Sequence, residues 1–331
     1  MDIFPHWLSE QREHLFERIE HDQLPHALLF HGPPGTGRRL LALSVIGRVL
    51  GFDAAGLEAA GSAAVASGPL IDPELAPAHP DFTVAQPPPD KRVIQIEQIR
   101  QLIEVLHLTS HQSGYKVALI NPAQALTRHA ANSLLKTLEE PPGRTVIVLI
   151  TDSLSRLPAT IVSRCQRIRI GLPSAAQAQQ WLQARDPAAD WGSILAIAGG
   201  APLTALHYHE EEIPARVARF ERDMDALEAG QNSPTAVAKA WANADPEVCL
   251  NWLYRRISGE ILDGCQGLAA QAGAKTGNRD LQKGPEKLNM ERAFADLTYI
   301  GELRRLQGSG LNGELQLSGI LTRWYGRHAA G

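Results

Sequence analysis

Cysteine is scarce in this sequence, and the few cysteines stand far apart. The 331 residues contain three, Cys165, Cys249 and Cys265, and no Cys-x-x-Cys pair. Structural zinc sites and dithiol redox centres need clustered thiols, so we expect reduced cysteines. The twelve histidines are not clustered at ligand spacing either. The sequence therefore predicts no metal site.

Long apolar runs are also missing. No stretch of about 18 or more apolar residues occurs, which argues against a membrane span. The charged amino terminus, MDIFPHWLSEQREHLFERIEH, lacks the apolar centre and the cleavage site of a secretory signal. We therefore expect a cytoplasmic protein without a membrane partner.

An excess of positive charge is absent as well. The formal net charge is -4, so no overall field draws the chain onto nucleic acid. Composition therefore favours protein partners over direct binding of DNA.

Strand-like and helical segments alternate through the first half of the chain, which predicts an α/β fold with a parallel sheet. The expected strands are residues 27–30, 81–85, 116–120, 145–150 and 166–170. The expected helices are residues 38–51, 96–108 and 123–140. In the last of these, apolar residues recur every fourth position, and Pro141 ends the helix.

The length and the change of pattern after Ile170 predict three domains. Residues 1–171 form the α/β domain, with a low-complexity insertion rich in Ala, Gly, Ser and Pro at about 52–80. Residues 172–210 form a small helical lid. Residues 211–331 form an all-helical domain.

The stretch FHGPPGTGRRL, residues 30–40, has the glycines of a phosphate-binding loop between a predicted strand and a predicted helix. The glycines are Gly32, Gly35 and Gly37. Such a loop continues with Lys, which reaches the β- and γ-phosphates, and with Ser or Thr, which holds Mg²⁺. Arg38 keeps the positive charge, but Arg39 offers no oxygen to a metal ion.

A second metal ligand is missing in the same region. An acidic residue should follow the strand at 116–120, but the chain continues with Asn121 and Pro122, which offer neither a carboxylate for Mg²⁺ nor a base for the attacking water. We expect no intrinsic ATPase activity. Two interpretations of the loop remain open: a weak nucleotide site made by its three glycines and Arg38, or a glycine turn that only looks like a P-loop.

Several segments together resemble one known family. They are LPHALLFHGPPGTGRR, AHPDF, IEQIRQL, GYKVALINPAQALTRHAANSLLKTLEEPPGRTVIVLITDSLSRLPATIVSRCQ, GGAPLTAL and LNGELQLSGILTRW. In order and spacing they resemble the delta-prime subunits of bacterial DNA polymerase III, AAA+ relatives within the clamp loader. The resemblance is dense over 24–170 and sparser beyond.

The resemblance implies an AAA+ domain, a lid and a helical collar domain that holds the subunit in a hetero-oligomer. It also implies a stator that hydrolyses no ATP itself, a component of the DNA-directed DNA polymerase holoenzyme that helps to load the sliding clamp onto primed DNA. Its implied partners are the motor subunits gamma and tau, the clamp-opening delta subunit, the sliding clamp and primed DNA.

The resemblance assigns a role to Arg164, within Ser163, Arg164 and Cys165. In this family the arginine of the Ser-Arg-Cys motif is an arginine finger for the ATP of the neighbouring motor subunit, where a planar guanidinium neutralises charge on the γ-phosphate. The alternative is a surface salt bridge. Thr151 falls where AAA+ proteins keep a polar sensor, but turn chemistry is the favoured interpretation here.

The sequence departs from the family in one respect. Family members commonly carry four cysteines for a structural zinc after the first helix, whereas residues 50–80 contain none, so we predict no zinc. Two rival functions remain: an active AAA+ motor subunit of the gamma or tau type, and a stand-alone AAA+ protein of DNA repair.

Overall fold

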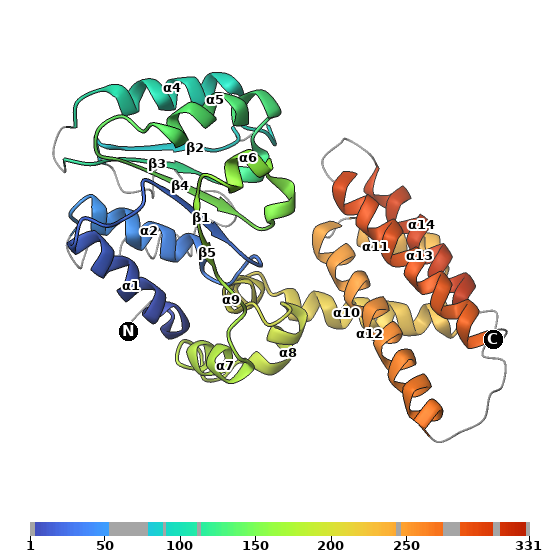
Figure 1. The fold of residues 1–331 in the computed structure, drawn as a ribbon. Helices are drawn as coiled ribbons and strands as arrows, with labels where there is room; N and C mark the ends of the chain where they lie inside the picture. Colours follow the sequence, from blue (N-terminus) through green and yellow to red (C-terminus); the bar gives the residue numbers. More distant parts are fainter. Residues whose placement is uncertain are drawn as a thin grey trace. The chain divides into compact units, whose positions relative to one another are not determined.

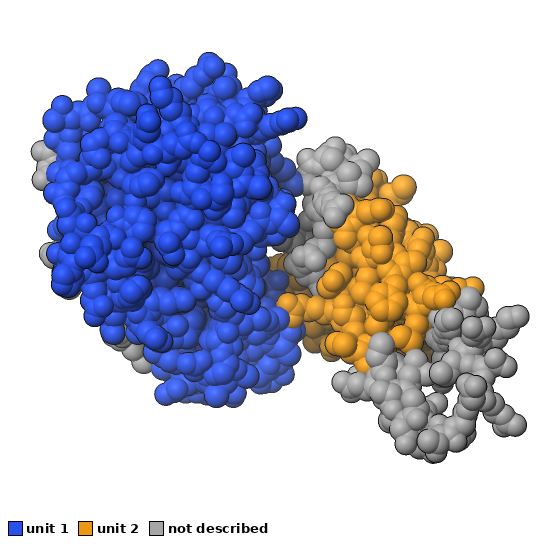
Figure 2. All heavy atoms as spheres, viewed as in Figure 1, with its two compact units in different colours: residues 1–208 blue, residues 209–331 orange. Residues whose placement is uncertain are grey.

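The computed structural model describes residues 4–52, 79–88, 91–110, 114–242, 246–273, 285–306 and 312–328. The chain divides into two compact units, Met1–Tyr208 and His209–Gly331 (Figure 2). The predicted boundary after residue 171 lies inside the first unit, and the three-domain division stays a prediction. Most of the predicted insertion, residues 53–78, lies outside the described residues.

Five parallel strands form one sheet in the order β2, β3, β4, β1, β5. The strands are β1 (Ala27–His31), β2 (Phe82–Ala85), β3 (Lys116–Ile120), β4 (Thr145–Thr151) and β5 (Gln166–Arg169). Each was predicted to within one residue at either end. The parallel α/β class predicted from the sequence is confirmed.

Helices cover both faces of the sheet (Figure 1). The helices α1 (Ser9–Glu20) and α2 (Arg38–Val49) lie on one face, and α4 (Ile96–His107) and α5 (Arg128–Glu139) on the other. Successive strand residues point to opposite faces, so Leu28 and Phe30 join the core under α2 whereas Ala27 and Leu29 join the core under α5. Burial on both faces explains why β1, β3 and β4 are continuous apolar runs.

The helix predicted at 123–140 begins later, so that prediction was wrong at its amino end. Ala123–Ala125 form a short 3-10 helix, and α5 starts at Arg128. The side chain of Thr127 caps α5 by accepting a hydrogen bond from the backbone N–H of Ala130 at 3.2 Å. The apolar repeat suggested an earlier start of the helix because Leu126 packs on the same core although it lies outside the helix.

Three short helices follow the sheet, and the last of them ends two residues beyond the first unit. They are α7 (Ala175–Gln183), α8 (Trp191–Ile197) and α9 (Pro202–Glu210). They share a small core that contains the buried Trp181 and Trp191. Trp7, from the turn before α1, packs edge-on against Trp181 with ring centroids 5.3 Å apart. This contact ties the small helical core to the amino terminus of the chain.

The second unit is helical in all of its described elements. These are α10 (Ile213–Glu228), α11 (Pro234–Trp241), α12 (Pro246–Gly273), α13 (Pro285–Leu306) and α14 (Gly313–His328). Its core is aromatic: Phe220 lies 4.5 Å from Trp241 between ring centroids, and Trp252 packs on both. Within the described part of the chain, no helix is both long and apolar enough to cross a membrane.

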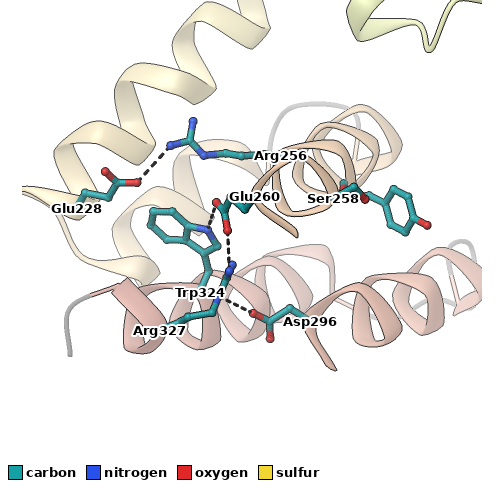
Figure 3. A network of polar contacts seen from close by, with 8 residues as sticks. Glu228, Arg256, Ser258, Glu260, Asp296, Trp324 and Arg327 are labelled. Atoms are coloured by element: carbon teal, nitrogen blue, oxygen red, sulfur yellow. Dashed lines mark hydrogen bonds and ion pairs between the residues drawn. The ribbon is translucent and has the colours of Figure 1, made fainter. Parts of the chain in front are cut away.

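A polar network joins three helices of this unit (Figure 3). Arg327 of α14 donates to Glu260 of α12 at 2.6 Å and lies 3.4 Å from the carboxylate of Asp296 on α13. Glu260 also accepts from the indole Nε1 of Trp324 at 3.3 Å. Arg327 and Asp296 are almost completely buried, so each charge depends on its partners.

Candidate functional site

The loop after β1 is a tight turn built on three glycines. Its three glycines all adopt positive φ angles, 147° at Gly32, 73° at Gly35 and 99° at Gly37. A side chain is strained in this region. Gly37 is also the N-cap residue that directly precedes α2, and its conformation is left-handed. The sequence therefore predicted the turn and the helix that follows it correctly.

The same loop is packed closely by other parts of the first unit. The backbone N–H of Leu203, on α9, donates to the carbonyl of Gly35 at 3.0 Å. A Cβ placed on Gly35 would lie 2.0 Å from the Oγ1 of Thr204. On the other side, the indole of Trp7 donates to the carbonyl of Thr36 at 3.0 Å. The glycines are thus needed for close packing as well as for their φ angles.

Two arginines occupy the first turn of α2, where no acidic residue is present. A helix amino terminus disfavours positive charge because of the helix dipole. Burial lowers the pKa of Arg39 to about 10. Burial also lowers the pKa of Arg38, and the nearby carboxylate of Asp152 partly opposes that effect. Asp152 is an acid beside the loop that sequence reasoning missed.

No acid follows β3, where an ATPase would carry a carboxylate for its metal ion. Asn121 follows β3, is buried, and donates its backbone N–H to the carbonyl of Ala85 at 3.0 Å. At the end of β4, the hydroxyl of Thr151 donates to the carbonyl of Ser153 at 3.0 Å, and the N–H of Ser153 returns to that hydroxyl at 3.3 Å. Thr151 thus makes the turn contacts that the favoured interpretation expects.

Arg164 lies between α6 (Ala159–Val162) and β5. Its Nε donates to Oε1 of Glu139 at 2.6 Å, and its Nη2 forms an ion pair with the same oxygen. Its Nη1 donates to the carbonyl of Thr160 at 2.9 Å. The side chain is 33% exposed. The salt bridge that the sequence left as an alternative is therefore present, and the guanidinium still reaches the surface.

A shallow open pocket of ≈ 800 Å³ lies beside this arginine. It is lined by Leu154, Ser155, Leu157, Ala159, Val162, Ser163, Cys165, Gln166 and Arg167. The lining is mainly apolar, with the two neighbours of Arg164 at its wall. Burial raises the pKa of the Cys165 thiol to about 12, so this cysteine is a neutral packing residue rather than a nucleophile.

Arg164 and the glycine loop lie at opposite ends of two neighbouring strands. The glycine loop follows β1, whereas Arg164 precedes β5, and the two strands are parallel neighbours with Leu28 opposite Gln166 and His31 opposite Arg169. A strand rises about 3.3 Å per residue, so the two sites are roughly 15 Å apart. Arg164 therefore does not serve the loop of its own chain.

Comparison with known proteins gives the family. The family model described as DNA polymerase III, delta subunit matches residues 7–173. The delta-prime subunit of DNA polymerase III from Pseudomonas aeruginosa is 30% identical over 98% of this chain and 97% of its own length. This chain belongs to the delta-prime family of DNA polymerase III subunits. The resemblance inferred from the sequence motifs is confirmed.

Two further comparisons extend the result. The delta-prime subunit of Escherichia coli is 32% identical over 60% of this chain and 59% of its own length. A solved structure of a DNA polymerase III gamma subunit-related protein from Thermotoga maritima covers 96% of this chain and 99% of its own, with a TM-score of 0.50 and 17% identity. At that identity the likeness to the gamma-related protein supports the fold alone.

Proposed function

We propose that this delta-prime family member is a clamp-loader subunit that hydrolyses no ATP itself and supplies Arg164 to ATP held by a neighbouring subunit. The proposal rests on one observation: Arg164 precedes β5 whereas the glycine loop follows β1, so the two lie at opposite ends of neighbouring parallel strands. An arginine that cannot reach its own loop is free to face a site on another chain. Its planar guanidinium suits the charge that develops on a γ-phosphate.

The chain's own loop supports the second half of the proposal. Phosphoryl transfer needs a metal ion held by a hydroxyl and a carboxylate, and the corresponding positions carry Arg39 and Asn121. Arg38 and Arg39, at the start of α2, supply positive charge beside the glycine loop but no ligand for a metal ion. The sequence leaves open a weak nucleotide site made by Gly32, Gly35, Gly37 and Arg38. That site stays a prediction.

Assembly would depend on the second unit, His209–Gly331, as a helical collar. The partners we propose are the motor subunits gamma or tau and the clamp-opening delta subunit, acting together on the sliding clamp and primed DNA. The net charge of -4 favours these protein contacts over independent binding of DNA. No zinc is proposed, although residues 53–78, where the family's cysteines would stand, lie outside the described residues.

An ATPase assay of the isolated chain tests the non-hydrolysing role against the motor alternative. We expect no Mg²⁺-dependent turnover above background, because the metal has no ligands at Arg39 and Asn121. A gamma or tau subunit measured alongside is the positive control. ATP turnover that disappears in the Arg38→Ala chain would favour an active motor subunit. Co-purification with the motor subunits tests the other alternative: failure to co-purify would favour a stand-alone repair protein.

A further inference from the structure

The guanidinium of Arg164 is held from one side by a residue of a different helix. Glu139 is the last residue of α5, and its Oε1 accepts from Nε at 2.6 Å and pairs with Nη2. The remaining nitrogen, Nη1, donates to the carbonyl of Thr160 at 2.9 Å and lies 3.4 Å from the hydroxyl of Ser163. These contacts fix a side chain that otherwise rotates freely about its aliphatic stem.

The arrangement leaves one N–H of the guanidinium without an acceptor among the described residues. A guanidinium carries five N–H bonds in a planar fork. Nε and one hydrogen of Nη2 form the side edge, and this edge faces Glu139. The second hydrogen of Nη2 lies on the distal edge, and among the described residues it has no acceptor. The two hydrogens of Nη1 are directed to Thr160 and Ser163. A phosphate oxygen can approach the distal edge without displacing Glu139.

The contact is also too exposed to serve chiefly as a stabilising element. The Glu139 side chain is 50% exposed and that of Arg164 is 33% exposed. Ion pairs at this exposure contribute little to the stability of a fold, because water screens the attraction and ordering two long side chains costs entropy. The main effect of the contact between Glu139 and Arg164 is therefore to set the direction of the guanidinium.

We propose that Glu139 is the positioning residue for Arg164: its carboxylate orients the guanidinium so that the distal edge faces the neighbour's γ-phosphate. The inference rests on the proposed function of Arg164 as a donated arginine. Ordering the finger before ATP arrives removes an entropic cost from the neighbour's reaction, and a misplaced group loses much of its effect on the rate.

The test uses the whole loader, reconstituted with its ATPase subunits and with every ATPase site inactivated except the one next to Arg164. Glu139→Ala should lower the turnover of that site by about tenfold, with the KM for ATP and the melting temperature of the subunit unchanged. Glu139→Gln should lose less, since its amide oxygen still accepts from Nε. The matched control is Glu140→Ala, the next residue along the chain, which should behave as the unsubstituted loader.

The outcomes separate this inference from the proposed function. In an Arg164→Ala background, Glu139→Ala should cause no further loss, because its effect passes through the arginine. Unchanged or faster turnover in Glu139→Ala, with slow turnover in Arg164→Ala, would overturn the positioning role and leave the proposed function standing. An equal loss in Glu140→Ala would overturn it too. Normal turnover in Arg164→Ala would overturn both the positioning role of Glu139 and the proposed function of Arg164. If the Glu139→Ala subunit does not assemble into the loader, the turnover of Glu139→Gln tests the positioning role by the same criteria.

Discussion

Gly35 and Thr204 lie in contact across the first unit, with the backbone of the glycine loop against the first turn of α9. A Cβ on Gly35 would stand 2.0 Å from the Oγ1 of Thr204 and 2.9 Å from its backbone nitrogen. The glycine also has a φ angle of 73°. The loop that resembles a nucleotide site is therefore part of the packing between the sheet and the small helices.

Gly35→Ala should destabilise the protein by about 2–3 kcal/mol, because the new methyl group is both strained in φ and forced against Thr204. Gly143→Ala is the matched control: its φ angle is 56°, but nothing lies within 4 Å of the added Cβ, so only the strain of about 1 kcal/mol remains. Denaturant unfolding measures both. Equal losses would show that the contact with Thr204 is not what requires the glycine.

Asp296→Ala should destabilise the second unit by about 3 kcal/mol, because the buried Arg327 then loses one of its two carboxylate partners. Arg219→Ala is the control, since its pair with Asp223 is 3.9 Å long and the arginine is 61% exposed; it should cost less than about 1 kcal/mol. Denaturant unfolding of both chains tests the difference. A loss from Asp296→Ala no larger than that from Arg219→Ala would contradict the account of this network.

Cys165 should react slowly with iodoacetamide at pH 8.5 while the chain is folded. Its pKa is about 12, whereas an unfolded cysteine titrates near 8.5, so the folded thiolate is scarcer by about a thousandfold. Stability should fall as the pH rises above about 8.5, because only the unfolded chain then loses this proton. Peptide mass spectrometry gives the alkylation rate, with the denatured chain as control. Rapid alkylation in the folded state would contradict the burial of this thiol.

The fold was largely predictable from the sequence because the three central strands are buried on both faces. A strand covered on two sides is a continuous apolar run, as in β1, β3 and β4. The edge strands β2 and β5 are partly exposed and mix polar with apolar residues, yet their predicted bounds also lie within a residue. The amino end of α5 was not predictable in this way. Leu126 continues the apolar repeat but packs from an extended segment, and the cap at Thr127 sets the start of the helix.

The residues of the candidate site were predictable only where they belong to a local sequence motif. The glycines, the two arginines and Arg164 stand in short recognisable stretches. Glu139 and Asp152 were missed because each meets its partner through the fold: Glu139 is 25 residues from Arg164 along the chain, and Asp152 reaches Arg38 because β4 and β1 are neighbours. The parallel strand order could have indicated Asp152. Nothing in the sequence indicates the rotamer that brings Glu139 to the guanidinium.

The most direct test of the proposed function is the stimulated ATPase of an assembled loader that carries Arg164→Ala. An arginine finger contributes on the order of 10³–10⁵ in rate at one site, so clamp- and DNA-stimulated hydrolysis at the adjoining site should collapse while the melting temperature and co-elution of the subunit stay normal. Arg164→Lys should rescue little, since an ammonium group lacks the planar fork. A stable, fully assembled Arg164→Ala loader with unaltered ATPase activity and clamp loading would contradict the account.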